Sequence, residues 1–183
     1  ASLNDQMASV KRSLLLMTGW DYDSDVVIGA IPEPDVSQID SIDLEADKAA
    51  APGNNYTIIN MRNSSPADVD GDGIYENKDY LARSRGVDQA SQQLSITLDS
   101  LYQTLFERRA ALKAQETAFQ AAQLSWNGAQ QKYQLGMLGR AEFIGQEIAY
   151  DAASAAYQSA KLNMTQAMLN YYWGVNGLGE LAQ

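Results

Sequence analysis

Apolar residues recur at seven-residue intervals through the second half of the chain, in two sets separated by Gly136 and Gly139. The first set is Leu98, Leu105, Leu112, Phe119, Trp126 and Tyr133, and the second is Phe143, Tyr150, Tyr157, Met164 and Tyr171. An interval of seven places apolar side chains along one side of a helix, where they form a packing seam. The pattern predicts an all-α fold dominated by a long antiparallel coiled-coil-like helical hairpin over residues 87–178, with 179–183 as a tail.

The hydrophobic pattern is less regular before this hairpin. Residues 1–19 have apolar positions at helical spacing followed by Gly19, which predicts the end of a helix from a preceding segment. Residues 20–62 contain three prolines and scattered Asp, and predict an irregular connector with one short helix near Ile42–Ala50. The segment Tyr56–Met61 fits either a short strand or a helical turn.

The amino-acid composition of the chain limits the kinds of partner and reaction that it can support. The chain has 183 residues, 23 acidic against 13 basic side chains, a formal charge of −10, and neither Cys nor His. The acidic balance argues against nucleic acid as a partner, because phosphate binding needs clustered Lys and Arg. The missing Cys and His exclude thiol nucleophiles, imidazole bases and most zinc, copper and haem sites. No enzymatic activity is predicted, no apolar run reaches the length of a membrane-spanning helix, and no signal peptide is visible in the first residues.

Residues 63–86 interrupt the pattern with "NSSPADVDGDGIYENKD". The D-x-D-x-D-G spacing matches calcium loops, in which carboxylates converge on one cation and Gly permits a sharp turn. The predicted ligands, at loop positions one, three, five, seven, nine and twelve, are Asp68, Asp70, Asp72, the carbonyl of Ile74, Glu76 and Asp79. The sequence therefore predicts a structural Ca²⁺ that fixes a corner before the long helix, and the alternative is a metal-free Asp/Gly turn.

The hairpin sequence "AQQKYQLGMLGRAEFIGQEIAYDAASAAYQSAKLNMTQAMLNYYWGVNGL" resembles the C-terminal repeat of the outer membrane efflux protein family, the TolC-like channels. The matching positions are Tyr133, Gly136, Glu142, Phe143, Tyr150, Ala153, Tyr157, Ala160, Gly177 and Leu178. The resemblance covers residues 87–178. A weaker similarity of "VKRSLLLMTGW" to the end of the family's first repeat implies that the chain is the back half of a duplicated protein.

The resemblance implies a function. Family members are homotrimers whose hairpins form a hollow α-barrel, a passive conduit for efflux or export. The family's hairpin tip, here Leu135, Gly136 and Met137, docks a periplasmic adaptor protein of a pump, and Met137 departs from the small or polar residue usual there. Glu142 matches an acidic position at the pore entrance, and the alternative for this residue is a solvated acid that stabilises a helix N-terminus.

One departure from the family bears on localisation. The family inserts two amphipathic barrel strands between its connector and its long helix, and residues 62–86 contain no such strand. A dockerin-like calcium loop stands there instead. The sequence thus predicts an exported protein of the cell envelope and argues against insertion in an outer membrane. Besides a channel subunit, a non-channel calcium-stabilised helical scaffold or adhesion protein stays open, with assembly state as the discriminator.

Overall fold

The computed structural model describes residues 2–21, 24, 26–27, 29, 33–71 and 73–178. Its elements are α1 (Ser2–Met17), the 3₁₀ helix η1 (Val36–Ser41), α2 (Leu44–Asn54), α3 (Tyr56–Asn63), α4 (Asn77–Gln134) and α5 (Arg140–Val175). The described residues contain no strand, which confirms the all-α prediction for them. The chain divides into two compact units, residues 1–31 and residues 32–183.

The first unit consists of α1 and the segment that follows it. As the spacing predicted, α1 ends just before Gly19. The amides of Gly19 and Trp20 donate to the carbonyls of Leu16 and Leu15, at 3.2 and 2.9 Å. This is the hydrogen-bond pattern with which helices commonly end at a glycine.

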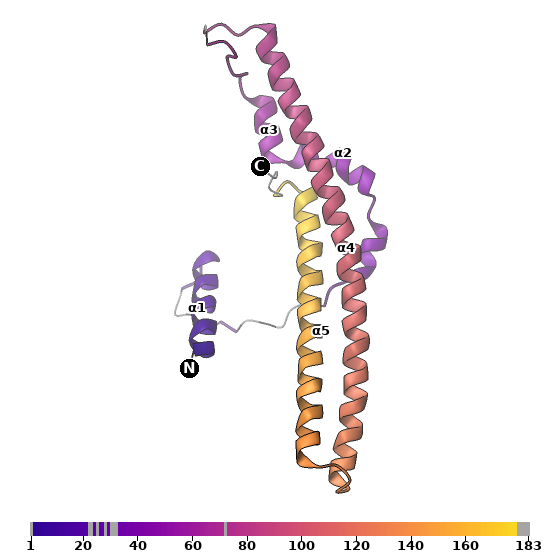
Figure 1. Cartoon of the computed structure of the whole chain (residues 1–183). Helices are drawn as coiled ribbons and strands as arrows, with labels where there is room; N and C mark the ends of the chain where they lie inside the picture. The colour runs from indigo at the N-terminus through magenta and orange to yellow at the C-terminus, as the bar shows by residue number, and fades with distance from the viewer. Residues whose placement is uncertain are drawn as a thin grey trace. The chain divides into compact units, whose positions relative to one another are not determined.

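The second unit is built on α4 and α5, which run side by side in Figure 1. With 58 and 36 residues they extend about 87 and 54 Å at 1.5 Å per residue. Ring contacts join Tyr133 to Phe143 at 4.3 Å, Trp126 to Phe143 at 4.8 Å and Phe119 to Tyr157 at 5.5 Å between centroids. Contacts move down one helix as they move up the other, so α4 and α5 are antiparallel and meet along the predicted seam.

Within the second unit, η1, α2 and α3 cover the end of this pair that lies away from its turn, as Figure 1 shows for α2 and α3. One buried cluster joins η1 to α4 and α5 and consists of Ile39, Leu105, Met164, Ala167 and Tyr171. A second joins α2 and α3 to α4 and consists of Ala51, Ile58, Val87, Leu94 and Leu98. Salt bridges also join η1 and α2 to α4. Arg109 pairs with Asp40 at 2.6 Å, and Lys48 pairs with Asp99 at 2.5 Å.

Two local expectations change, and one open alternative is decided. The long helix begins at Asn77 rather than near Val87, so the second half of the predicted corner is helical. The ambiguous segment Tyr56–Met61 lies in a helix, α3. The short connector helix continues to Asn54 through Pro52, which lies in its last turn and removes one helical hydrogen bond. Among the described residues, no helix combines the length and apolarity needed to cross a membrane.

Candidate functional site

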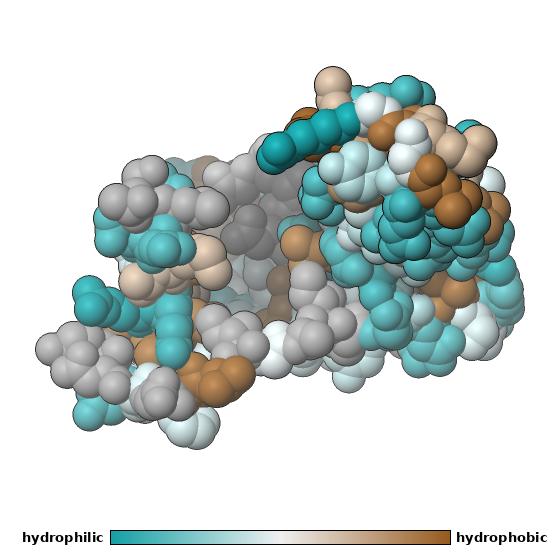
Figure 2. All heavy atoms as spheres, turned by 90° about the horizontal axis from the view of Figure 1, so that it is seen from below, coloured by the Kyte–Doolittle hydropathy of each residue, from teal (hydrophilic) through white to brown (hydrophobic). Residues whose placement is uncertain are grey.

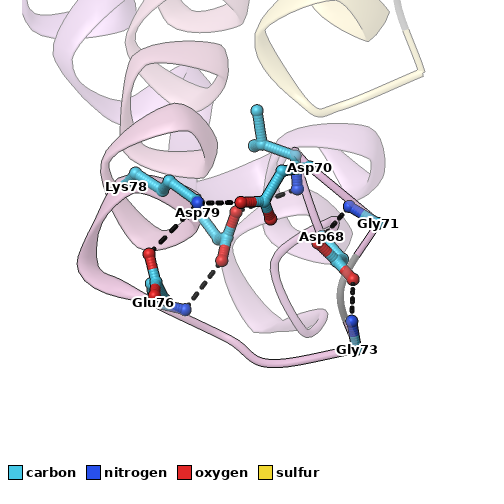
Figure 3. A network of polar contacts seen from close by, with 8 residues as sticks. Asp68, Asp70, Gly71, Gly73, Glu76, Lys78 and Asp79 are labelled. Carbon is cyan, nitrogen blue, oxygen red and sulfur yellow. Dashed lines mark hydrogen bonds and ion pairs between the residues drawn. The ribbon is translucent and has the colours of Figure 1, made fainter.

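The acidic stretch folds as a loop that leads directly into α4 (Figure 3). The two carboxylate oxygens of Asp68 accept hydrogen bonds from the backbone amides of Gly71 and Gly73, each at 2.7 Å. The bonds from Gly73 and Gly71 hold the pKa of Asp68 below its ordinary value, because they stabilise the charged carboxylate. Asp68 is therefore the organising residue of the loop's first half.

Asp79 organises the second half. Its side chain is fully buried, and its oxygens accept the amides of Val69 at 2.9 Å and Glu76 at 2.7 Å. Asp79 thus ties the start of the loop to the first turn of α4 and satisfies an amide that the helix itself leaves unpaired. This cap explains why the helix begins at Asn77, although the hydrophobic pattern starts later.

Lys78, in the first turn of α4, contacts the acidic loop and was missed by the sequence prediction. Its ammonium forms ion pairs with the carboxylates of Asp70 and of Glu76, the latter at 3.1 Å. The hydrogen bond to Asp70, followed by that to Glu76, raises the pKa of Lys78. The sequence contained a signal, since Lys78 is at position eleven of the calcium motif, next to a predicted ligand. The motif is defined by its acidic positions, so a search for it does not identify this lysine.

The loop fits a calcium ion by its chemistry, since carboxylate and carbonyl oxygens are the ligands that Ca²⁺ takes. Asp72 lies outside the described residues, and Ile74 is exposed beside Gly73. Among the described residues, no three acidic side chains gather closely enough to hold a metal ion. The arrangement instead has Lys78 neutralising Asp70 and Glu76, so Ca²⁺ at these residues requires Lys78 to leave.

The second candidate site is the tip, residues 135–139, between α4 and α5. The amides of Gly136 and Met137 donate to the carbonyls of Tyr133 at 3.0 Å and Lys132 at 2.8 Å, and Gly136 has φ of +71°. This is a Schellman end, in which glycine avoids the cost of a positive φ.

The motif at the tip leaves Leu135 and Met137 exposed, at 73% and 72% of their surface. Seen from below, hydrophobic side chains lie among hydrophilic ones at this end (Figure 2). The structure thus brings the three predicted tip residues together and presents two apolar side chains to solvent.

Glu142 lies in the first turn of α5 and is exposed. It lines a polar depression of about 290 Å³ together with Lys132 of α4. A carboxylate at this position is favoured by the helix N-terminus. In the single chain, stabilisation of the α5 N-terminus is enough to explain Glu142. The predicted position at a pore entrance would require assembly of several chains.

The acidic loop and the tip do not form one site. Both border α4, but at opposite ends of its 58 residues, about 85 Å apart along the helix. A ligand bound at one site therefore does not contact the other site directly. Compared with known proteins, the chain matches no protein-family model, no curated protein and no solved structure.

Proposed function

We propose that this chain is a subunit of a TolC-like trimeric channel of an efflux or export system, in which α4 and α5 form a coiled-coil-like hairpin of a hollow α-barrel. The sequence resemblance over residues 87–178 and the antiparallel α4–α5 pair support this proposal. The resemblance implies that such a channel is a passive conduit for efflux or export.

The observation that carries the proposal is the outer face of α5. Ile148, Ala155, Leu162 and Leu169 recur every seven residues and are all exposed, the three larger ones at 62%, 48% and 50%. They lie on the side of the helix opposite Tyr157 and Met164, which pack against α4. A helix that is apolar on two opposite faces needs a partner on each, and copies of the same hairpin would supply the second.

The tip supports the docking part of the proposal. Exposed Leu135 and Met137 flank Gly136, whose missing side chain leaves open space around the backbone. An adaptor-like protein of a pump would bury these two side chains.

We also propose that Ca²⁺ organises the loop. Asp68, Asp70, Asp72, Glu76 and the carbonyl of Ile74 would hold it, with Asp79 close by as cap or ligand. The ion would replace the ammonium of Lys78 and fix the direction in which the chain enters α4. Titration calorimetry with CaCl₂ tests this, since Lys78→Gln should bind Ca²⁺ more tightly and Asp70→Asn more weakly than the unaltered chain. Absence of heat from all three would favour a metal-free turn.

Sedimentation equilibrium tests the assembly, with and without Ca²⁺. We expect a mass three times the 20.0 kDa of the chain. Leu162→Glu should dissociate the trimer, because it places a charge on the outer face of α5. Asn163→Glu is the matched control: it adds the same charge at an exposed position about 100° around the helix. A monomer or dimer, both for the unaltered chain and for a protein that carries both repeats, would overturn the channel and favour the scaffold.

A further inference from the structure

A cavity of about 650 Å³ lies between the connector and the α4–α5 pair. This volume is within the range of small-molecule sites. Its apolar lining comes from Ile39 and Ile42 of the connector, Leu105 of α4, and Met168 and Val175 of α5. Because these residues belong to three separate parts of the second unit, the cavity exists only when the connector is docked on the helix pair.

Two carboxylates, those of Asp43 and Asp47, line the cavity. Asp47 accepts the hydroxyl of Tyr171 through Oδ2 at 2.7 Å, and Asp43 caps α2 by accepting the amide of Ala46 through Oδ1 at 3.1 Å. Each carboxylate keeps its second oxygen clear of these bonds. Burial and then the hydrogen bond to Asp47 raise the pKa of Tyr171, so the phenol keeps its proton and donates it in the hydrogen bond.

Among the described residues that line the cavity, none is a Lys or Arg whose charge would balance the two carboxylates. The ammonium of the neighbouring Lys48 forms ion pairs with Glu45 and Asp99, at 3.2 and 2.5 Å. The N-terminus of α2 offsets part of the two negative charges. The charged side chains among the described lining residues are those of Asp43 and Asp47, both acidic.

We propose that this cavity binds a monovalent lipophilic organic cation, with its apolar body against Ile39, Leu105 and Met168 and its charge facing Asp43 and Asp47. Two observations select this class of ligand over a neutral one. Among the described residues neither carboxylate forms an ion pair with Lys or Arg, and the same cavity is lined by Tyr171 and Tyr172, a residue type whose ring face can attract a cation. The site goes beyond the channel role and does not depend on assembly.

A pair of nearly isosteric compounds tests the charge requirement. Methyltriphenylphosphonium carries one positive charge, and triphenylphosphine oxide has the same three rings without it. In titration calorimetry on the 183-residue chain at low salt, we expect the cation to bind about tenfold more tightly, because a pair of close charges in a partly enclosed site adds that much.

The double variant Asp43→Asn with Asp47→Asn removes both charges and keeps the helix cap and an acceptor for Tyr171. We expect it to weaken binding of the cation about tenfold while leaving the oxide unchanged. Glu147→Gln with Asp151→Asn is the matched control, since it changes the net charge equally at two exposed positions of α5. The control should bind the cation like the unaltered chain.

Three results would overturn the proposal. Equal binding of the oxide and the cation would identify a neutral apolar site, and equal weakening by the control variant would identify unspecific attraction to an acidic protein. The third is absence of binding to the unaltered chain. If the Asp43/Asp47 variant loses helical circular dichroism, Met168→Trp provides the second test, since it fills the cavity without changing its charge and should abolish cation binding.

Discussion

Replacing Gly177 with Ala should destabilise the protein much more than the same change at Gly136. Both glycines end a long helix with a positive φ, +91° at Gly177 and +71° at Gly136. They differ in their surroundings. A methyl group at Gly136 meets nothing within 4 Å, whereas at Gly177 it would lie 2.0 Å from the backbone oxygen of Asn54 and 2.6 Å from its carbonyl carbon.

The magnitudes follow from these surroundings. An L-residue with positive φ costs about 1–2 kcal/mol, and Ala recovers part of this by restricting the unfolded chain, which leaves about 1 kcal/mol for Gly136→Ala. At Gly177 the backbone of Asn54 must also move. That shift breaks the bond from the Asn54 side chain to the carbonyl of Val175, at 3.1 Å, and disturbs the buried cap Asn55. We expect about 3 kcal/mol in total.

Urea unfolding followed by circular dichroism at 222 nm measures both changes, with linear extrapolation to water. Equal costs for the two variants, within about 0.5 kcal/mol, would refute the reasoning, because backbone conformation alone would then account for both glycines. Spectra without urea provide the control that each variant folds.

Three further changes have defined outcomes. Asp79→Ala removes the buried acceptor of two amides and should lower the free energy of unfolding by about 2–3 kcal/mol in urea, whereas Asp79→Asn should cost about half as much. Tyr171→Phe loses the 2.7 Å bond to Asp47 and should cost about 1 kcal/mol by the same titration. Because the pKa of Asp68 lies below the ordinary 3.8, its stabilisation is present above that pH and is lost as the pH falls through the folded pKa. The protection factors of the amides of Gly71 and Gly73, which correct for the slower intrinsic exchange in acid, should fall in that acidic window, and Asp68→Asn should remove this pH dependence.

The helix pair could be predicted because its signal is local and repeated. Eleven apolar positions at one spacing specify two helices and the side on which they meet, and their contacts, such as Trp126 to Phe143, lie along that seam. The position of the turn was also indicated, since Gly136 and Gly139 separate the two apolar sets, and the structure ends α4 there in a Schellman motif.

The connector could not be predicted in the same way, because its position depends on pairs far apart in sequence. Arg109 binds Asp40 from 69 residues away, and Tyr171 binds Asp47 from 124 residues away. No local pattern identifies such partners. The start of α4 was missed for a related reason, since the cap of Asp79, rather than apolar spacing, fixes it.

Burial along the α4–α5 pair falls from the connector end to the tip. Leu105 and Met164 are 1% and 0% exposed beneath η1, while Tyr133, in the same seam, is 40% exposed. Each seam residue near the tip therefore removes less apolar surface from water and contributes less stability. In a single chain the tip half should be the first part to open. Neighbouring copies packed against Ile148 and Ala155 would stabilise the half that the connector does not reach. Assembly and order at the tip should therefore rise together, and hydrogen exchange near the tip should slow only when the chain associates.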